Sequence, residues 1–167
     1  NFYALSSYYL GSFFSPLVYF FNVQSMPDAV YLITLLKFGA IGLSAYISLH
    51  GIFSKIPRCL VLTLSTSFAL MSFAISQIEI KTWLDVFILA PLILYGFKKL
   101  IYNEGEVLYF ISLTSLFIQN YYFGFMMSIF LILWYLTQLS WNIKKIGKRF
   151  FHFVIVSLLS VITSLVM

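Results

Sequence analysis

The residues of this chain that could take part in chemistry are a few polar side chains set within long apolar runs. Asp85 follows Trp83 by two positions at the start of one run, and Lys37 lies inside another. The stretch QNYYFGFM, residues 119–126, places two amides and two phenols in the middle of a third run. Any enzyme built on this chain must therefore work with carboxylate, ammonium, amide and hydroxyl groups.

Two interpretations are open for Asp85. An ionised carboxylate at a membrane boundary is costly unless it faces water, a cation or a polar cavity, so such acids tend to be functional. An aspartate in the first turn of a helix is also stabilised by the helix dipole, with no further role.

Two interpretations are open for Lys37 as well. The residue lies about 12 Å along its helix from the outer end, which is further than a lysine side chain reaches by snorkelling. A buried anionic partner, either a carboxylate or the phosphate of a bound lipid, is the favoured interpretation, and snorkelling is the alternative.

The familiar catalytic and cofactor-binding motifs are absent from the sequence, which has no Walker loop, nucleophile elbow or Rossmann fingerprint. Cys59 is the only cysteine, which excludes an internal disulfide and a multi-cysteine metal site. His50 and His152 are far apart in sequence and fit no metal-ligand spacing, so we predict no metal ligands and interpret both as helix-end residues. The net charge of +5 comes from basic residues between apolar runs, which indicates membrane topology and no nucleic-acid partner.

The composition indicates an integral membrane protein. Hydrophobic residues make up 62% of the chain and charged residues 9%, whereas soluble domains are about half apolar and a quarter charged. The chain begins at Asn1 without an initiator methionine and ends inside an apolar run, so we interpret it as a fragment of a longer polytopic protein.

The predicted fold is an all-α bundle of transmembrane helices, each needing about 20 apolar residues to cross the bilayer. The bundle covers residues 29–167, with spans at about 29–53, 59–76, 83–101, 107–119, 122–140 and 150–167. Residues 1–28 are aromatic, rich in serine and interrupted by Pro16 and Pro27. They are predicted to form an external interfacial or re-entrant segment, and a short extra span near residues 13–21 is the alternative.

The positive-inside rule supplies the orientation of these spans. If Lys55 and Arg58 are cytoplasmic, a single span over the run 107–138 would leave the basic loop 142–149 outside. Two spans that meet near residues 120–122 return that loop to the cytoplasm, and only Lys37 and Lys81 of the 10 basic residues then lie elsewhere. The stretch QNYYFGFM thus becomes an outward-facing turn on the same side as Asp85.

Five stretches, taken in order, resemble the YfhO family of bacterial polytopic membrane proteins. They are FYALSSYYLGSFFSPLVYFF, LITLLKFGAIGLSAYISL, SFALMSFAISQ, WLDVFILAPLILYGFKKLI and FIQNYYFGFMMSIFLILWYL. The family pattern matches here at Ser15–Pro16, Leu35–Gly39, Trp83–Asp85, Pro91–Leu92 and Asn120–Met126.

The resemblance implies a GT-C-type glycosyltransferase with a multi-helix bundle and amphipathic elements in its first external loop. Such a protein moves a sugar from a polyprenyl-phosphate donor to a cell-envelope polymer, typically lipoteichoic or a related teichoic acid, outside the bacterial cell membrane. Lys37 would then meet the donor phosphate, Asp85 would act as an acid, base or orienting group, and Asn120, Tyr121 and Tyr122 would contact sugar hydroxyls. The main catalytic acid of GT-C enzymes is expected upstream of this fragment.

The partners implied by the resemblance are membrane lipid, the polyprenyl-phosphate sugar and the teichoic acid polymer. It names no certain cofactor and leaves a divalent metal open. A transporter or lipid flippase component is the alternative function, because it would also bury Lys37 and Asp85, and a non-catalytic membrane scaffold is a third. The outward clustering of the polar residues favours the transferase over a transport pathway.

Overall fold

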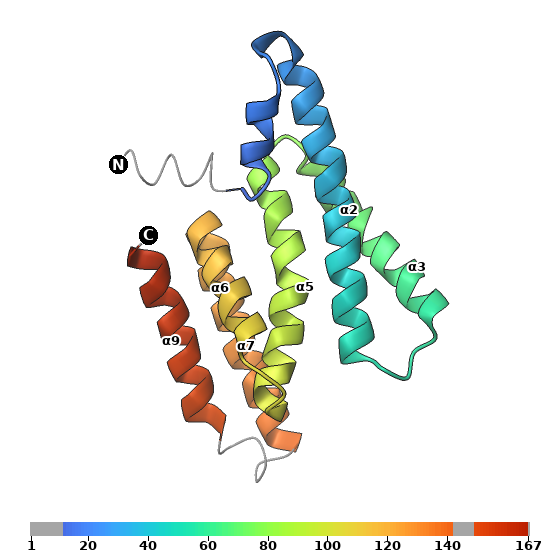
Figure 1. Cartoon of the computed structure of the whole chain (residues 1–167). Helices are drawn as coiled ribbons and strands as arrows, with labels where there is room; N and C mark the ends of the chain where they lie inside the picture. Colours follow the sequence, from blue (N-terminus) through green and yellow to red (C-terminus); the bar gives the residue numbers. More distant parts are fainter. Residues whose placement is uncertain (1–11, 142–148, 167) are drawn as a thin grey trace. The chain divides into compact units, whose positions relative to one another are not determined.

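The computed structural model describes residues 12–141 and 149–166, and this part of the chain is helical without a strand (Figure 1). The elements, in chain order, are η1 (Ser15–Phe20), η2 (Val23–Ser25), α2 (Met26–Ile52), α3 (Arg58–Ala69), α4 (Ser72–Ser76), α5 (Lys81–Tyr102), α6 (Val107–Gln119), α7 (Tyr121–Trp141) and α9 (Phe150–Val166). The prediction of an all-α membrane protein is confirmed.

Three helical segments are long and apolar enough to cross a membrane, namely Val23–Ile52, Arg58–Ser76 and Tyr121–Gln138. Two apolar helices are shorter, Val107–Gln119 and Phe150–Leu165. Helix α5 has 22 residues and carries Asp85, Lys98 and Lys99. The helices begin and end within a few residues of the predicted spans, except that the second span is divided into α3 and α4 at Leu70 and Met71.

The segment before α2 holds two short 3-10 helices, and neither contains a buried residue. The longer of them, η1, has 6 residues, which is far fewer than a membrane span requires. The alternative of an extra span near residues 13–21 is therefore wrong. Residues 1–11 of the predicted external segment lie outside the described part of the chain.

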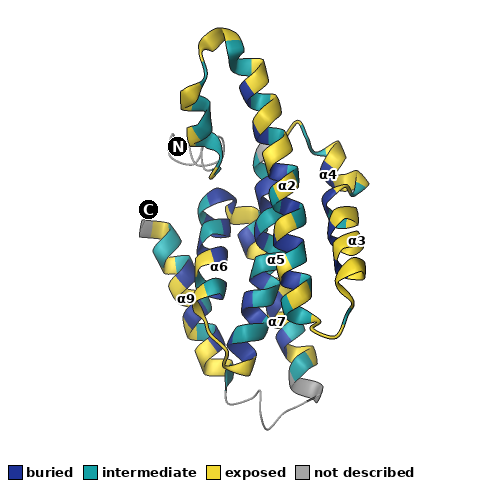
Figure 2. Cartoon of the chain, turned by 45° about the vertical axis from the view of Figure 1, so that its right-hand side comes forward, coloured by how far each residue is buried: buried dark blue, intermediate teal, exposed yellow. Residues whose placement is uncertain are grey.

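The chain divides into two compact units, Asn1–Ile88 and Leu89–Met167, and α5 contains the boundary between them. In the first unit the chain runs along α2 and returns along α3, which packs on it (Figure 1). The core of this unit is small, and it joins Ile41 of α2 and Ala69 of α3 to Ala74 of α4 and Leu84 of α5, all fully or almost fully buried. Both helices leave apolar side chains exposed on the opposite face, as expected for helices surrounded by lipid (Figure 2).

The second unit is built on aromatic packing among α5, α6, α7 and α9. The Phe97 ring lies 5.0 Å from Trp134 and 5.4 Å from Phe153, measured between ring centroids. A Cβ atom at Gly96 would lie only 2.6 Å from the backbone nitrogen of Tyr109, so glycine is what lets α5 and α6 touch backbone to backbone. The Tyr109 hydroxyl reaches Ser157 of α9 at 2.8 Å.

Candidate functional site

A buried salt bridge joins Lys37 of α2 to Asp85 of α5. The Lys37 Nζ atom lies 2.8 Å from the Asp85 Oδ2 atom, and the two side chains are 1% and 2% exposed. Both residues belong to the first unit. The favoured interpretation of Lys37, a buried anionic partner, is therefore confirmed, and the partner is a carboxylate of this chain.

Each helix carries its charged residue on the face that it buries. On α2, Lys37 is one helical repeat from Ile33 and one from Ile41, and all three are buried. On α5, Asp85 lies one turn beyond the helix start, next to the fully buried Leu84. Apolar neighbours thus exclude water from both charges, and the two charges must compensate each other.

Only one of the two Asp85 carboxylate oxygens, Oδ2, contacts Lys37. Opposite charges in contact offset part of each other's loss of hydration, whereas an unpaired buried charge is strongly destabilising. The second carboxylate oxygen, Asp85 Oδ1, is buried and has no hydrogen-bond partner among the described residues. Because a carboxylate oxygen is an acceptor with room for two hydrogen bonds, Oδ1 is available to a donor that enters the site.

The segment before α2 supplies part of the cover over the pair. The Lys37 Nζ atom lies 5.9 Å from the centroid of the Phe14 ring, within the range of a cation–π interaction. Phe14 immediately precedes η1, which packs against α2. A molecule approaching the pair from this side therefore meets an aromatic side chain of the external segment.

The α6–α7 junction holds the other predicted site residues. Helix α6 ends at Gln119 and α7 begins at Tyr121, with Asn120 between them in an extended conformation, φ −153° and ψ 94°. The Asn120 Oδ1 atom accepts a hydrogen bond from the Phe123 backbone N–H at 3.3 Å, which is the geometry of a helix N-cap. Asn120 is 6% exposed, whereas the two tyrosines that follow it are more than half exposed.

The family model described as bacterial membrane protein YfhO matches residues 1–167, the full length of the chain. The chain belongs to the YfhO family. No curated protein and no solved structure matches it. The predicted family and the predicted membrane location are confirmed by this match together with the membrane-spanning helices.

In this YfhO-family chain the predicted site residues fall into two groups. Lys37 and Asp85 are in direct contact within the first unit. Asn120, Tyr121 and Tyr122 belong to the second unit, where Asn120 is turned into the protein and both tyrosines are exposed. Asn120 is already used as a helix cap, so the exposed tyrosine rings are the better candidates for contact with a ligand.

Gln119 lies in the predicted outward turn but was not among the predicted site residues. Its side chain is buried, and neither Oε1 nor Nε2 has a hydrogen-bond partner among the described residues. A buried amide without a hydrogen bond lowers stability by about 1–3 kcal/mol. The presence of glutamine at position 119 therefore calls for an explanation. The signal in the sequence is a glutamine at the end of an apolar run, directly before the residue that breaks the helix.

A further polar cluster, which the sequence did not predict, lies at the start of α9. His152 contacts the Glu106 carboxylate, and Arg149 donates a hydrogen bond to the Asn103 side chain at 2.5 Å. These contacts tie α9 to the loop between α5 and α6, so His152 is a helix-start residue with an acidic partner. In the described part of the chain no group of three or more His, Cys, Asp or Glu side chains is suited to hold a metal ion.

Proposed function

We propose that this YfhO-family chain is part of a membrane glycosyltransferase of the GT-C type. The enzyme takes a sugar from a polyprenyl-phosphate donor and attaches it to a cell-envelope polymer, lipoteichoic or a related teichoic acid. The reaction takes place on the extracytoplasmic side of the bacterial membrane. Family membership supports the class, and the sequence motifs that resemble the family support the donor and the acceptor.

The observation that carries the proposal is the buried Lys37–Asp85 pair, whose Asp85 Oδ1 atom accepts no hydrogen bond from the described part of the chain. Ionisable residues inside a membrane protein are costly and commonly mark functional sites. Asp85 follows Trp83 by two positions, and tryptophan is enriched at membrane interfaces. This spacing supports a location of the pair near the outer boundary of the hydrocarbon, where the phosphate of a lipid-linked donor also lies.

The proposed transfer is a nucleophilic substitution at the anomeric carbon of the sugar. A hydroxyl of the acceptor attacks this carbon, the bond to the phosphate oxygen breaks, and polyprenyl phosphate leaves. The hydroxyl proton passes to a carboxylate, for which Asp85 Oδ1 is the candidate in this part of the protein. Lys37 holds the Asp85 carboxylate in position through their contact, and its ammonium group is the candidate to meet the departing phosphate.

The Lys37 contact with phosphate requires a rearrangement. The Lys37 side chain is 1% exposed, so a phosphate reaches Nζ only after the covering residues, Phe14 among them, have moved. The exposed rings of Tyr121 and Tyr122 are suited to stack on a sugar or to bond its hydroxyls, and Asn120 holds their helix in place.

The direct test uses the full-length protein in a strain that lacks its gene. We expect deletion to remove one sugar from the teichoic acid, and the wild-type gene to restore it. Asp85→Asn and Lys37→Met should not restore the sugar although the protein is present in the membrane. The matched control is the double variant Lys37→Met/Asp85→Leu, which removes both charges and so keeps the fold. Full glycosylation by the double variant would contradict the proposal.

The extracytoplasmic orientation has an independent test in the single cysteine. Cys59 is exposed at the start of α3, next to Arg58, which the charge pattern assigns to the cytoplasm. A membrane-impermeant maleimide should therefore leave Cys59 unlabelled in intact cells. The same reagent should label Tyr122→Cys in a Cys59→Ser background, because Tyr122 is 66% exposed. The reverse labelling pattern would contradict the orientation.

One observation favours the alternative of a transporter component. Ser44 and Ser48 are buried on the same face of α2 as Lys37, and the Ser48 hydroxyl has no hydrogen-bond partner among the described residues. A polar stripe of this kind could continue a pathway inward from the ion pair. Ser48→Ala separates the two functions, because it should leave glycosylation intact and impair only a transport activity that depends on the stripe.

A further inference from the structure

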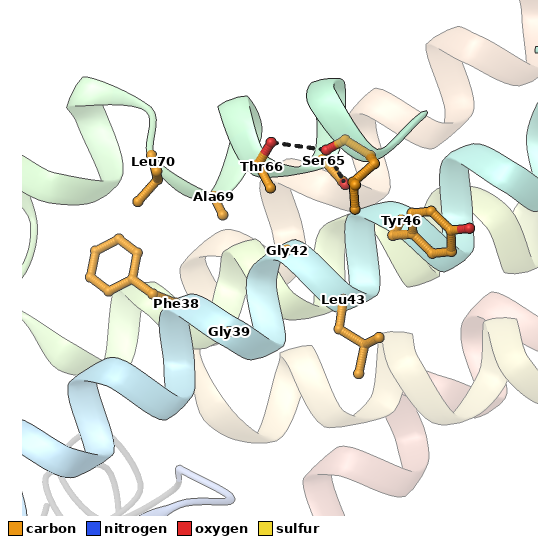
Figure 3. A pocket seen from close by; sticks show the side chains of 10 residues that line it. Phe38, Gly39, Gly42, Leu43, Tyr46, Ser65, Thr66, Ala69 and Leu70 are labelled. Atoms are coloured by element: carbon orange, nitrogen blue, oxygen red, sulfur yellow. Dashed lines mark hydrogen bonds between the residues drawn. The ribbon is translucent and has the colours of Figure 1, made fainter. Parts of the chain in front are cut away.

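Two hollows of this chain differ in what their linings can recognise. The hollow of 520 Å³ between α2 and α3 is lined by apolar side chains, two glycines, a serine and a threonine (Figure 3). Its Ser65 and Thr66 hydroxyls both donate to the Leu62 carbonyl at 2.9 Å, and no charged side chain of the described residues lines it. The second hollow, of 410 Å³, is lined mainly by charged and amide side chains and belongs to the second unit.

This second hollow lies where α5 ends and where α6 and α9 begin. Leu100 of α5 is buried and contributes an apolar surface to it. The loop Asn103–Glu106 contributes an amide and two carboxylates, and the start of α9 contributes Arg149 and His152. Figure 1 shows the end of α5 and the starts of α6 and α9 at the same end of this unit. We call the space the α5–α9 pocket.

The α5–α9 pocket lies at the level of the lipid headgroups. Tyr102 at the end of α5 and Phe150 and Phe151 at the start of α9 are exposed, and aromatic side chains at the ends of apolar helices are typical of the membrane interface. The basic loop 142–149 directly before α9 assigns this end to the cytoplasmic leaflet. The headgroups of that leaflet are therefore the most concentrated molecules around the pocket.

The pocket holds charges of both signs that are not paired with each other. The Glu104 carboxylate forms no ion pair or hydrogen bond within residues 12–141 and 149–166. Arg149 donates to the neutral Asn103 side chain at 2.5 Å and contacts no acid of the same residues. A guanidinium has five N–H donors, and a carboxylate is an acceptor at both oxygens. Most of this capacity remains open to a ligand.

The chemistry of the lining selects a ligand that carries both charges. A guanidinium binds phosphate through its planar fork of N–H donors, and a carboxylate accepts hydrogen bonds from an ammonium group. A headgroup with negative charge alone would be attracted by Arg149 and repelled by Glu104 and Glu106. A ligand with positive charge alone would be repelled by Arg149. A phosphate with an ammonium group a few atoms away matches all of these groups.

We propose that the α5–α9 pocket binds the zwitterionic headgroup of an amine-bearing phospholipid such as phosphatidylethanolamine. Its phosphate lies on Arg149 and its ammonium group on Glu104. The inference goes beyond the proposed function and does not rest on it, because it concerns a lipid of the cytoplasmic leaflet. The bound headgroup joins the α5–α6 loop to the start of α9, beside the direct contacts of Asn103 with Arg149 and of Glu106 with His152.

The test measures lipid selectivity of the full-length protein. Native mass spectrometry after exposure to equal amounts of phosphatidylethanolamine and phosphatidylglycerol with identical acyl chains gives the occupancy of each lipid. We expect phosphatidylethanolamine to be bound several-fold more. Hydrogen–deuterium exchange in nanodiscs of each lipid places the effect, because phosphatidylethanolamine should slow exchange in peptides that cover 100–106 and 149–153. Equal occupancy by the two lipids would overturn the inference.

Glu104 supplies the matched variants, because its carboxylate has no contact in the described part of the chain whose loss would disturb the fold. Glu104→Gln should abolish the preference for phosphatidylethanolamine, and Glu104→Lys should reverse it toward phosphatidylglycerol. The control is Glu79→Lys, the same change at an exposed glutamate that does not line the pocket, and it should leave the preference intact. A preference that persists in both Glu104 variants would overturn the inference.

A soluble zwitterion has the same charges as the lipid headgroup, so a further measurement separates the two sources. Glycerophosphoethanolamine, added to the protein in phosphatidylglycerol nanodiscs, should leave exchange in 100–106 and 149–153 unchanged. Slower exchange with this compound, without any slowing by phosphatidylethanolamine, would assign the pocket to a soluble ligand and overturn its assignment to a lipid.

Discussion

The Lys37–Asp85 ion pair and the amide of Gln119 are both buried, but their hydrogen-bonding environments differ. Lys37 and Asp85 form an ion pair in direct contact, so each offsets the other's loss of hydration. Gln119 at the α6–α7 junction is neutral, and both of its polar atoms are buried without a partner among the described residues. The stability of the protein therefore depends strongly on the presence of both Lys37 and Asp85, whereas the buried amide of Gln119 lowers the stability by a small amount. The two should respond to mutation with opposite signs.

The largest effect is expected where the ion pair is broken. Lys37→Met or Asp85→Leu alone leaves an uncompensated buried charge and should lower the free energy of unfolding by about 3–5 kcal/mol. The double variant removes both charges and should be close to the wild type in stability, because apolar replacements of a buried pair are often neutral. Thermal or denaturant unfolding of the full-length protein in detergent measures all three. A double variant as unstable as the sum of the single variants would show that the charges do not interact.

An intermediate effect on stability is expected when the close packing at the α6–α7 junction is disturbed. A Cβ atom at Gly124 would lie 2.7 Å from the ring of Phe117, which is buried and packs near Tyr121 at 5.8 Å between centroids. Gly124→Ala should therefore destabilise the protein by about 1–3 kcal/mol through overpacking.

The matched control for Gly124→Ala is Gly39→Ala in the first unit. No atom of the described residues lies within 4 Å of a Cβ added at Gly39, so the substitution should stabilise its helix by up to about 1 kcal/mol. If both alanine variants changed stability in the same direction and by the same amount, helix propensity alone would explain them, and close packing at the junction would be refuted.

The sequence predicted the fold class and favoured an anionic partner for Lys37, but it did not identify that partner. The depth of Lys37 within an apolar run is a local property, so helical rise alone favoured a buried anion over snorkelling. Its partner is 48 positions away, and the pairing depends on which faces of α2 and α5 meet, which local periodicity does not determine. The division between α3 and α4 was missed for a related reason, because Leu70 and Met71 carry no proline or glycine signal.

The candidate site shows the same limit at the α6–α7 junction. Charge counting predicted a turn near residues 120–122, because only two spans place the basic loop 142–149 in the cytoplasm. The sequence could not rank the polar residues of that turn. Asn120 and Gln119 are adjacent amides, yet Asn120 caps a helix, whereas the Gln119 side chain has no hydrogen-bond partner within residues 12–141 and 149–166. That difference arises from the direction of each side chain at a helix end, which appears only in three dimensions.

The smallest effect, and the sharpest contrast with the ion pair, is expected at Gln119. Gln119→Met keeps the length of the side chain and removes the two unpaired polar atoms, so it should raise the free energy of unfolding by about 1 kcal/mol. The matched comparison is Asn120→Ala, which removes a helix cap and should lower it by about 1 kcal/mol. Unfolding of both variants beside the wild type shows whether each substitution raises or lowers the free energy of unfolding.

Sugar transfer by Gln119→Met separates a structural role of the amide from a functional one. If Gln119→Met is more stable than the wild type but has lost sugar transfer, the amide is required for activity and not for folding, which identifies it as a group that contacts a ligand. A destabilised Gln119→Met would instead show that the amide has a partner in the full-length protein, and the contrast between the two regions would fail.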